Sequence, residues 1–297
     1  MVIRISAPQG FTEIGQKPNQ EDTVFPRLDT VSEKQRVFIV CDGVGGHEHG
    51  EVASKCVAET IGMITSSVPL CTTDEMRKMF EKALEEAYDR LDALDKDDER
   101  EKTMGTTIAF LAICKDGVLS AHIGDSRIYQ LRKGKGVVFQ SRDHSLVNEL
   151  LASGDLDENE AKNYLLKNVI TRAIQPHQEY RDKASFKVLS DVREGDVFFL
   201  CSDGIVEKLD NDELAQILLQ RADLKSRIDS LKEECLKRGT RDNNSCYAFE
   251  IVNIEMVKQY NECLWTKLKR LLKEIINPRC LVLMEEGIGN NESEAAD

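Results

Sequence analysis

The sequence lacks an apolar run near the roughly 18 residues that a membrane span needs. Residues 1–4 also lack the long apolar core of a signal peptide. The nine cysteines include no CxxC pair and no framework spacing, so nothing indicates a disulfide scaffold. Cys41, Cys114 and Cys201 lie inside apolar runs, which predicts buried thiols in a reducing compartment. We therefore expect a cytoplasmic protein without a membrane segment.

A basic excess is also missing. The 297 residues hold 53 acidic and 40 basic side chains, and the formal net charge is -13. This balance argues against nucleic acid as a partner, because a phosphate backbone requires a basic surface. A solvated acidic surface explains most of the excess, and acids gathered at a cation site would explain part of it. The hydrophobic share of 41% is that of an ordinary globular protein with one large domain or two small ones.

The apolar run at residues 37–41 is the stretch around which the chain is organised. It is short, β-branched and aromatic, which is typical of a strand buried on both faces. Asp42 follows directly, and a glycine-rich turn from Gly43 to Gly50 allows left-handed backbone angles and close approach to an ion. A carboxylate at such a strand end is a typical ligand of a hard metal ion.

Apolar stripes at helical spacing predict amphipathic helices over residues 52–64 and 76–94. Short β-rich runs separated by turn signals then predict an antiparallel meander, over residues 107–114, 118–123, 127–132 and 137–140. The polar residues 145–180 interrupt this pattern as an inserted subdomain with helices around 145–153 and 158–165. The remaining strands are expected at residues 184–189, 196–201 and 245–252, with helices at about 210–220 and 224–238 between the last two. Helices before, between and after two groups of strands indicate a layered α+β sandwich.

Further carboxylates stand at strand ends. Asp125 and Asp203 each follow an apolar run, Asp242 precedes the last run, and Glu21 and Asp22 precede another. If these strand ends meet at one edge, the carboxylates would repel one another unless divalent cations relieve the repulsion. Oxygen ligands favour Mg²⁺ or Mn²⁺, and two such ions bridged by one carboxylate can activate water and hold a phosphoryl group.

Asp42 is the expected bridging ligand, with the Gly43 carbonyl as a neutral one. Each motif has a simpler interpretation, because a lone Asp-Gly pair is most often a turn and Asp125 could stand at a hairpin corner. A zinc site at His47 and His49 is a weaker alternative, because no cysteine or third histidine lies nearby. The joint placement of four aspartates at strand ends favours the metal site.

The chain closely resembles the metal-dependent serine/threonine protein phosphatases of type 2C. The motifs that carry this resemblance occur in family order within about residues 10–252; they are Asn19-Gln20-Glu21-Asp22, Asp42-Gly43-Val44-Gly45-Gly46-His47, Gly50-Glu51-Val52-Ala53-Ser54, Gly105-Thr106-Thr107, Gly124-Asp125-Ser126-Arg127, Asp143-His144-Ser145, Ile170-Thr171-Arg172-Ala173, Ser202-Asp203-Gly204 and Asp242-Asn243.

The resemblance implies a four-layer α-β-β-α sandwich, two antiparallel sheets flanked by helices, with a metal cleft at one end. It implies that Asp42 bridges two Mn²⁺ or Mg²⁺ ions, one of which also takes the Gly43 carbonyl. Asp203 and Asp242 would complete the other ion, Asp125 would help hold a third, weaker ion, and Glu21 and Asp22 would act directly or through bound water. A hydroxide bridging the two ions would attack the phosphorus of phosphoserine or phosphothreonine in a protein that an opposing kinase has phosphorylated. The insert at 145–180 would be the mobile flap beside the cleft.

Two departures from the family pattern concern the chemistry. Lys17 stands where many members have an arginine, which would replace a two-pronged phosphate contact with a point charge. Val44 stands where animal and plant members usually have a histidine proposed as general acid, so the chain is bacterial in type and metal-bound water would protonate the leaving group. Gln175, where glycine is usual, suggests only a locally different flap.

The expected domains are a phosphatase domain over residues 1–255, an additional helix over 256–278 and an acidic, disordered tail over 279–297. The helix has one apolar face that would dock on the domain; a partner surface is the alternative, and peripheral membrane binding is the minor one. Two other functions remain open, which are a catalytically weak or inactive phosphoprotein-binding module and the hydrolysis of a small phosphorylated metabolite. Lys17 alone supports the binding module.

Overall fold

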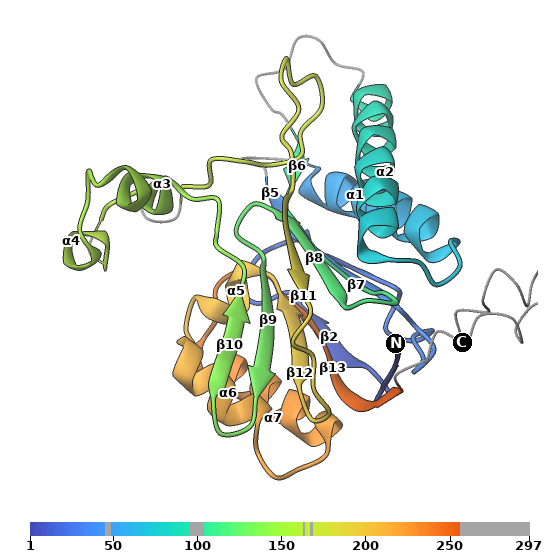
Figure 1. Cartoon of the computed structure of the whole chain (residues 1–297). Coiled ribbons are helices and arrows are strands. Elements are labelled where there is room, and N and C mark those ends of the chain that lie inside the picture. The colour runs from blue at the N-terminus through green and yellow to red at the C-terminus, as the bar shows by residue number, and fades with distance from the viewer. Residues whose placement is uncertain (45–48, 96–103, 163, 167–168, 256–297) are drawn as a thin grey trace, which may run out of the picture. The chain divides into compact units, whose positions relative to one another are not determined.

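The computed structural model describes residues 1–44, 49–95, 104–162, 164–166 and 169–255 (Figure 1). The chain divides into two compact units, Met1–Glu255 and Met256–Asp297. The second unit lies outside the described residues, and so do the helix expected at 256–278 and the tail expected at 279–297. Within the described part of the chain, no helix has both the length and the apolar character to cross a bilayer.

A five-stranded antiparallel sheet holds the predicted central strand. Its order is β11-β8-β7-β4-β3, formed by Ser185–Leu189, Val118–Ile123, Ile108–Ile113, Val37–Cys41 and Thr23–Phe25. All five residues of β4 are buried, as its β-branched and aromatic run predicts. Val37 and Cys41 pack with the helices on one face, whereas Phe38 and Val40 face the second sheet. Asp42 therefore leaves the sheet from a strand that is fixed on both sides.

The second sheet has six strands, and the last strand of the unit lies inside it. The order is β1-β13-β12-β9-β10, formed by Val2–Ile5, Asn244–Glu255, Val197–Cys201, Arg127–Arg132 and Gly136–Gln140. Strand β2, Gln9–Glu13, pairs with the first half of β13, and β1 pairs with its second half. A separate two-stranded ladder joins β5, Gly43–Val44, to β6, Gly105–Thr106.

Helices cover the outer face of each sheet (Figure 1). Helices α1, Gly50–Ser66, and α2, Thr73–Leu94, pack on the five-stranded sheet, and α6, Asn211–Leu218, and α7, Leu224–Arg238, pack on the six-stranded one. A capping box of Thr72 and Glu75 begins α2, which satisfies free backbone N–H groups there. A third core of residues from both sheets, including Phe38 stacked on Phe249, lies between them. The expected α+β fold with two antiparallel sheets flanked by helices is confirmed.

Two expectations about local structure were wrong. The four strands of the expected meander do not lie in one sheet, because β8 pairs with β7 and β11 while β9 pairs with β10 and β12. The chain changes sheet at Gly124, whose φ of 96° allows the turn. The inserted residues carry α3, Leu146–Ser153, as expected, but α4 covers only Glu158–Lys162. No residue of α3 is buried, so the apolar residues at helical spacing in this segment do not pack into a hydrophobic core.

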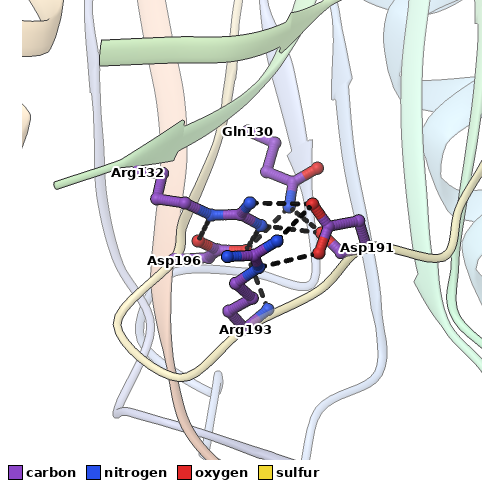
Figure 2. A network of polar contacts seen from close by, with 5 residues as sticks. All are labelled: Gln130, Arg132, Asp191, Arg193 and Asp196. Carbon is purple, nitrogen blue, oxygen red and sulfur yellow. Dashed lines mark hydrogen bonds and ion pairs between the residues drawn. The ribbon is translucent and has the colours of Figure 1, made fainter. Parts of the chain in front are cut away.

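A buried ion-pair network holds β9 against the loop that precedes β12 (Figure 2). Asp196 is fully buried and accepts hydrogen bonds from Arg132 Nε at 2.7 Å and from Gln130 Nε2 at 2.7 Å. Arg132 also binds Asp191, and hydrogen bonds from Arg193 and Arg132 lower the pKa of Asp191 to about 2. Since these donors and acceptors satisfy one another, the network is structural and leaves little to offer a ligand.

Candidate metal and active site

The backbone of Asp42 is held by two threonines of the neighbouring strand pair. Asp42 N donates to Thr107 Oγ1 at 3.1 Å, and Asp42 O accepts from Thr106 Oγ1 at 2.9 Å and from Thr107 N at 2.8 Å. Both threonines are fully buried. The carboxylate therefore projects from a backbone whose hydrogen bonds are all made, which fixes its direction.

Glycines allow the segment after Asp42 to approach α1 and the acidic pair at residues 21 and 22. Gly43 N donates to Glu21 O at 3.1 Å. A Cβ at Gly43 would lie 2.5 Å from the Gly50 carbonyl, and one at Gly50 would lie 3.2 Å from the Glu21 carboxyl carbon. The backbones meet there, so Gly43 has no room for a side chain and Gly50 has only tight room for one. Burial raises the pKa of Glu21, and the positive charge of Lys17 opposes that rise. The negative charge of Glu51, the residue after Gly50 in α1, raises the pKa of Glu21 further.

Asp22 and Asp203 come from different sheets and meet beside Ser202. Ser202 Oγ donates to Asp22 Oδ2 at 2.8 Å, while Asp22 Oδ1 is buried without a hydrogen-bond partner among the described residues. Asp203 begins the short helix α5, Asp203–Val206, directly after β12. Its Oδ1 is likewise buried and unpartnered within the described ranges. Both atoms are oxygens aimed into a buried site, which is the environment of a metal ligand or a protonated acid.

Asn243 ties the loop that carries Lys17 and Glu21 to the start of β13. Its Oδ1 accepts from Glu21 N at 2.7 Å, and its Nδ2 donates to Ile14 O at 2.8 Å and to Asn19 O at 2.9 Å. Next to it, Asp242 Oδ1 pairs with Lys17 Nζ at 2.9 Å. This pair brings the predicted phosphate contact to a predicted metal ligand, so Lys17 now neutralises part of the acidic charge.

The electrostatics show that the carboxylates share one site. Burial raises the pKa of Asp42 well above its usual range, and the charges of Asp22, Asp203 and Asp125 raise it further. Burial, followed by the charges of Asp203 and Asp242, raises the pKa of Asp22 to about 7 although Ser202 opposes the shift. Burial and the charges of Asp203 and Asp143 raise the pKa of Asp125 to about 7. Repulsion among buried carboxylates is the condition that a divalent cation relieves.

The structure brings together the residues that the sequence singled out, namely Lys17, Glu21, Asp22, Asp42, Gly43, Asp125, Asp203 and Asp242. Three supporting features were missed. These are the hydroxyls of Thr106 and Thr107 on the Asp42 backbone, the amide of Asn243 and the carboxylate of Glu51, whose Oε2 is buried without a partner in the described part of the chain. The motifs Gly105-Thr106-Thr107 and Asp242-Asn243 were the signal for the first two, but a motif does not say which atoms it satisfies.

Divalent ions fit this site by donor chemistry. All the side-chain ligands are carboxylates, which suit Mg²⁺ and Mn²⁺, and Asp22, Asp203 and Glu51 each leave a buried oxygen unpartnered among the described residues. As the side chains lie, no three His, Cys, Asp or Glu residues of the described ranges form a closed ligand set. Ion binding would therefore have to draw the carboxylates inward, and the positive charge of the ions would offset the repulsion that raises their pKa values.

A substitution at Gly204 tests how tightly the two metal-bearing strand ends are packed. A Cβ there would lie 2.0 Å from Asn243 O, a backbone atom that cannot move without Asp242. We expect Gly204→Ala to lower the free energy of unfolding by about 1–3 kcal/mol and to cut any metal-dependent catalytic activity of the site sharply. Gly134→Ala is the control: its φ of 77° costs about 1 kcal/mol, but the space around it is open and activity should persist. Equal activity of the two variants would contradict the close packing.

The metal-free protein should lose stability as the pH rises from about 4 to about 7. The pKa values of Asp22 and Asp125 are about 7 in the folded state, above the usual value, so the folded state binds more protons than the unfolded state in this window. That excess stabilises the protein at low pH and is lost as the pH passes the folded pKa. Thermal unfolding in a chelator at pH 5.5 and pH 8 measures the effect, and Mn²⁺ should reduce it. A higher Tm at pH 8 in chelator would contradict the prediction.

Comparisons with known proteins identify the family of the chain. A family model described as protein phosphatase 2C matches residues 12–236. Protein phosphatase PhpP of Streptococcus pneumoniae is 33% identical over 234 residues, which are 78% of this chain and 92% of that protein. The structure of an S. agalactiae serine/threonine phosphatase matches with a TM-score of 0.71 and 30% identity over 82% of this chain and 98% of that one. The catalytic domain of the phosphatase PstP, solved with two manganese ions, matches with a TM-score of 0.66 over 85% of this chain and all of that one. Its identity of 24% shows the shared fold alone.

The chain belongs to the protein phosphatase 2C family. The expectation of an enzyme of the protein serine/threonine phosphatase class is confirmed by this membership.

Proposed function

We propose that this chain hydrolyses phosphoserine and phosphothreonine in proteins with two Mn²⁺ or Mg²⁺ ions bound at the carboxylate cluster. The observation that carries the proposal is the convergence of four aspartates from both sheets in one site. Besides burial, the charges of Asp22, Asp125 and Asp203 raise the pKa of Asp42, and Asp203 also raises the pKa of Asp22 and of Asp125. Such crowding of carboxylates destabilises the fold unless bound cations neutralise their charge. The manganese ions of the similar PstP domain support the same assignment.

Asp42 would bridge the two ions, with the Gly43 carbonyl on one of them and Asp203 and Asp242 on the other. Glu21 and Asp22 would hold the surrounding water, and Asp125 would help hold a third ion. When bound, the ions would lower the pKa of the water between them and neutralise charge on the phosphoryl oxygens. The chain itself fixes the carboxylates: the threonine hydroxyls hold Asp42, Ser202 holds Asp22, and Asn243 holds the loop of Glu21.

Lys17 would contact the phosphate of the substrate. Its side chain is 41% exposed, so it can turn from Asp242 toward a bound anion once metal ions neutralise that carboxylate. Burial opposes the charge of Lys17, but its hydrogen bond to Asp242 and the nearby acids raise its pKa above the usual value. Lys17 is therefore a cation at any working pH.

The substrates would be phosphoproteins made by an opposing serine/threonine kinase in the cytoplasm. Seven cysteines of the described residues are free thiols, which supports a reducing compartment. We assign catalysis to residues 1–255 and substrate choice in part to the insert at 145–180. The apolar face predicted on the helix at 256–278 stays a prediction; it would dock on the phosphatase domain or bind a partner.

A metal-titrated assay on a phosphopeptide tests the proposal. We expect release of phosphate with Mn²⁺ or Mg²⁺ and none in a chelator. Tight phosphopeptide binding without hydrolysis would favour a binding module instead, and faster turnover of sugar phosphates than of the phosphopeptide would favour a metabolite phosphatase.

Lys17→Arg should improve phosphate binding. A guanidinium offers two parallel donors where the ammonium offers a point charge, so we expect KM for a phosphopeptide to fall by about tenfold or less at similar kcat. Lys17→Met should raise KM instead. Steady-state kinetics at saturating Mn²⁺ measure both, and Lys225→Met, in an exposed pair on α7, is the control. Unchanged KM in both Lys17 variants would remove Lys17 from the substrate contact.

A further inference from the structure

His144 makes a paired contact with the turn that carries Asp125. Its Nδ1 accepts a hydrogen bond from Gly124 N at 3.1 Å, and its backbone N donates to Gly124 O at 3.0 Å. The two bonds reach the peptide planes on both sides of Gly124, so together they fix φ and ψ of that residue. Asp125 is the next residue, and its direction follows from those two angles.

Gly124 needs such a restraint. Its φ of 96° lies in the region that only glycine adopts readily, and glycine is also the residue with the most backbone freedom. A Cβ at this position would lie 2.5 Å from the Thr107 side chain, so the sequence cannot limit that freedom with a larger residue. The restraint has to come from outside the turn, and the imidazole supplies it.

The imidazole of His144 is held in one tautomer. Nδ1 accepts a hydrogen bond from the Gly124 N–H, so the ring proton lies on Nε2, which donates to Ser185 Oγ at 2.8 Å. Burial, with the positive charges of His122 and Arg172, lowers the pKa of His144 to about 3. The ring also stacks on His122, with centroids 4.6 Å apart and planes 13° apart. The acceptor at Nδ1 is therefore present at any working pH.

The backbone around His144 is fixed without the ring. Asp143 accepts hydrogen bonds from both Nε and Nη2 of Arg127, the shortest at 2.8 Å and 2.7 Å respectively. Thr171 N donates to His144 O at 2.9 Å, and Ser145 forms a β-bridge with Ile170. A change of the imidazole alone should therefore leave the segment in place and remove only what the ring contributes.

We propose that His144 is a positioning residue of the phosphatase reaction, whose Nδ1 fixes the Gly124 peptide and thereby sets the direction of the Asp125 carboxylate. The inference rests on the proposed function in one respect, the assignment of Asp125 to the third metal ion. It adds a residue to the reaction that touches neither ion nor substrate. It also links the insert, through Ser145 at its start and Thr171 nearer its end, to that carboxylate.

Two near-isosteric substitutions separate the roles of the ring nitrogens. In His144→Asn the amide oxygen can take the place of Nδ1 and keep the bond from Gly124. In His144→Gln the amide can take the place of Nε2 and keep Ser185 while Nδ1 is lost. We expect the Mn²⁺ concentration for half-maximal activity to rise about tenfold in His144→Gln and less than threefold in His144→Asn. KM for the phosphopeptide should change little in either variant.

Asp125→Asn tests whether His144 affects Mn²⁺ binding through the Asp125 carboxylate. If His144 acts through Asp125, His144→Gln and Asp125→Asn should each weaken the loosest Mn²⁺ binding step in titration calorimetry, and the double variant should show no further loss. Additive losses, or equal loss of Mn²⁺ affinity in His144→Asn and His144→Gln, would overturn the proposal, and so would unchanged Mn²⁺ dependence in His144→Gln. Absence of metal-dependent turnover in the unsubstituted protein would instead overturn the proposed function, so the two failures are distinguishable.

Discussion

Asp42→Asn should reduce phosphopeptide turnover by a factor on the order of a thousand or more while leaving the metal-free fold intact. The substitution removes the charge of the one ligand proposed to be common to both ions. Charge stabilisation by such ions contributes several kcal/mol to a phosphoryl transition state, and about 4 kcal/mol corresponds to about a thousandfold in rate. Assays at saturating Mn²⁺, with burst controls for trace wild-type enzyme, measure the loss.

The same substitution should raise the Tm of the metal-free protein. Asp42 has its pKa raised by burial and by the charges of Asp22, Asp203 and Asp125, so its ionised form destabilises the fold near neutral pH. An amide of the same shape carries no charge and avoids that repulsion. In Mn²⁺ the order should reverse, because only the wild type gains stability from bound ions.

Asp229→Asn is the matched control for Asp42→Asn, because Asp229 lies in an exposed pair with Lys225 on α7. It should change neither activity nor the response to Mn²⁺. If Asp42→Asn kept wild-type turnover, the bridging role would be wrong. If the Asp42→Asn protein were unfolded in chelator, the Asp42 carboxylate would stabilise the metal-free fold, and the proposed repulsion at the site would be wrong.

Arg132→Met should lower the free energy of unfolding by about 3–5 kcal/mol, because it leaves a buried carboxylate without its cation. Asp196 is 0% exposed, and Arg132 donates to it from Nε and from Nη2 at 2.7 and 2.8 Å. Gln130 and the backbone N–H of Arg193 remain but cannot neutralise the charge (Figure 2). Urea unfolding in chelator measures the loss, and kcat per folded molecule should not change.

Arg193→Met is the control for that network. Its guanidinium binds Asp191, and the two side chains are 58% and 65% exposed. An exposed pair contributes about 0–1 kcal/mol, so the control should unfold near the wild-type midpoint. If Arg132→Met and Arg193→Met lost equal amounts of unfolding free energy, the burial of Asp196 would not be the cause of the loss in Arg132→Met.

Much of the fold was predictable because its signals are local. The run at residues 37–41 became β4, buried on both faces, and the apolar stripes at 52–64 and 76–94 became the inner faces of α1 and α2. The change of sheet between β8 and β9 was not predictable. Both strands are buried along nearly their whole length, so neither shows an alternation that would say which sheet it joins. Strands β1–β3 are short and were not distinguished from loops.

The carboxylates of the site were found for a similar reason. Asp42, Asp125 and Asp203 directly follow strand signals, so their placement needs only the strands to meet. The groups that hold them were not found, because each acts across a long separation in sequence. Asn243 reaches Ile14 and Asn19, and Thr106 reaches Asp42. No short pattern specifies such contacts.

Strand β13 is the last strand of its unit and yet lies between β12 on one edge and β1 and β2 on the other. During synthesis, therefore, β2 has no strand partner until Asn244–Ala248 have been made, and β1 has none until Ile251–Glu255 have been made. A nascent chain that stopped before Asn244 would expose unpaired strand edges of the kind that chaperones cover. The six-stranded sheet is therefore completed only after β13 has been translated, whereas every strand of the five-stranded sheet precedes residue 190.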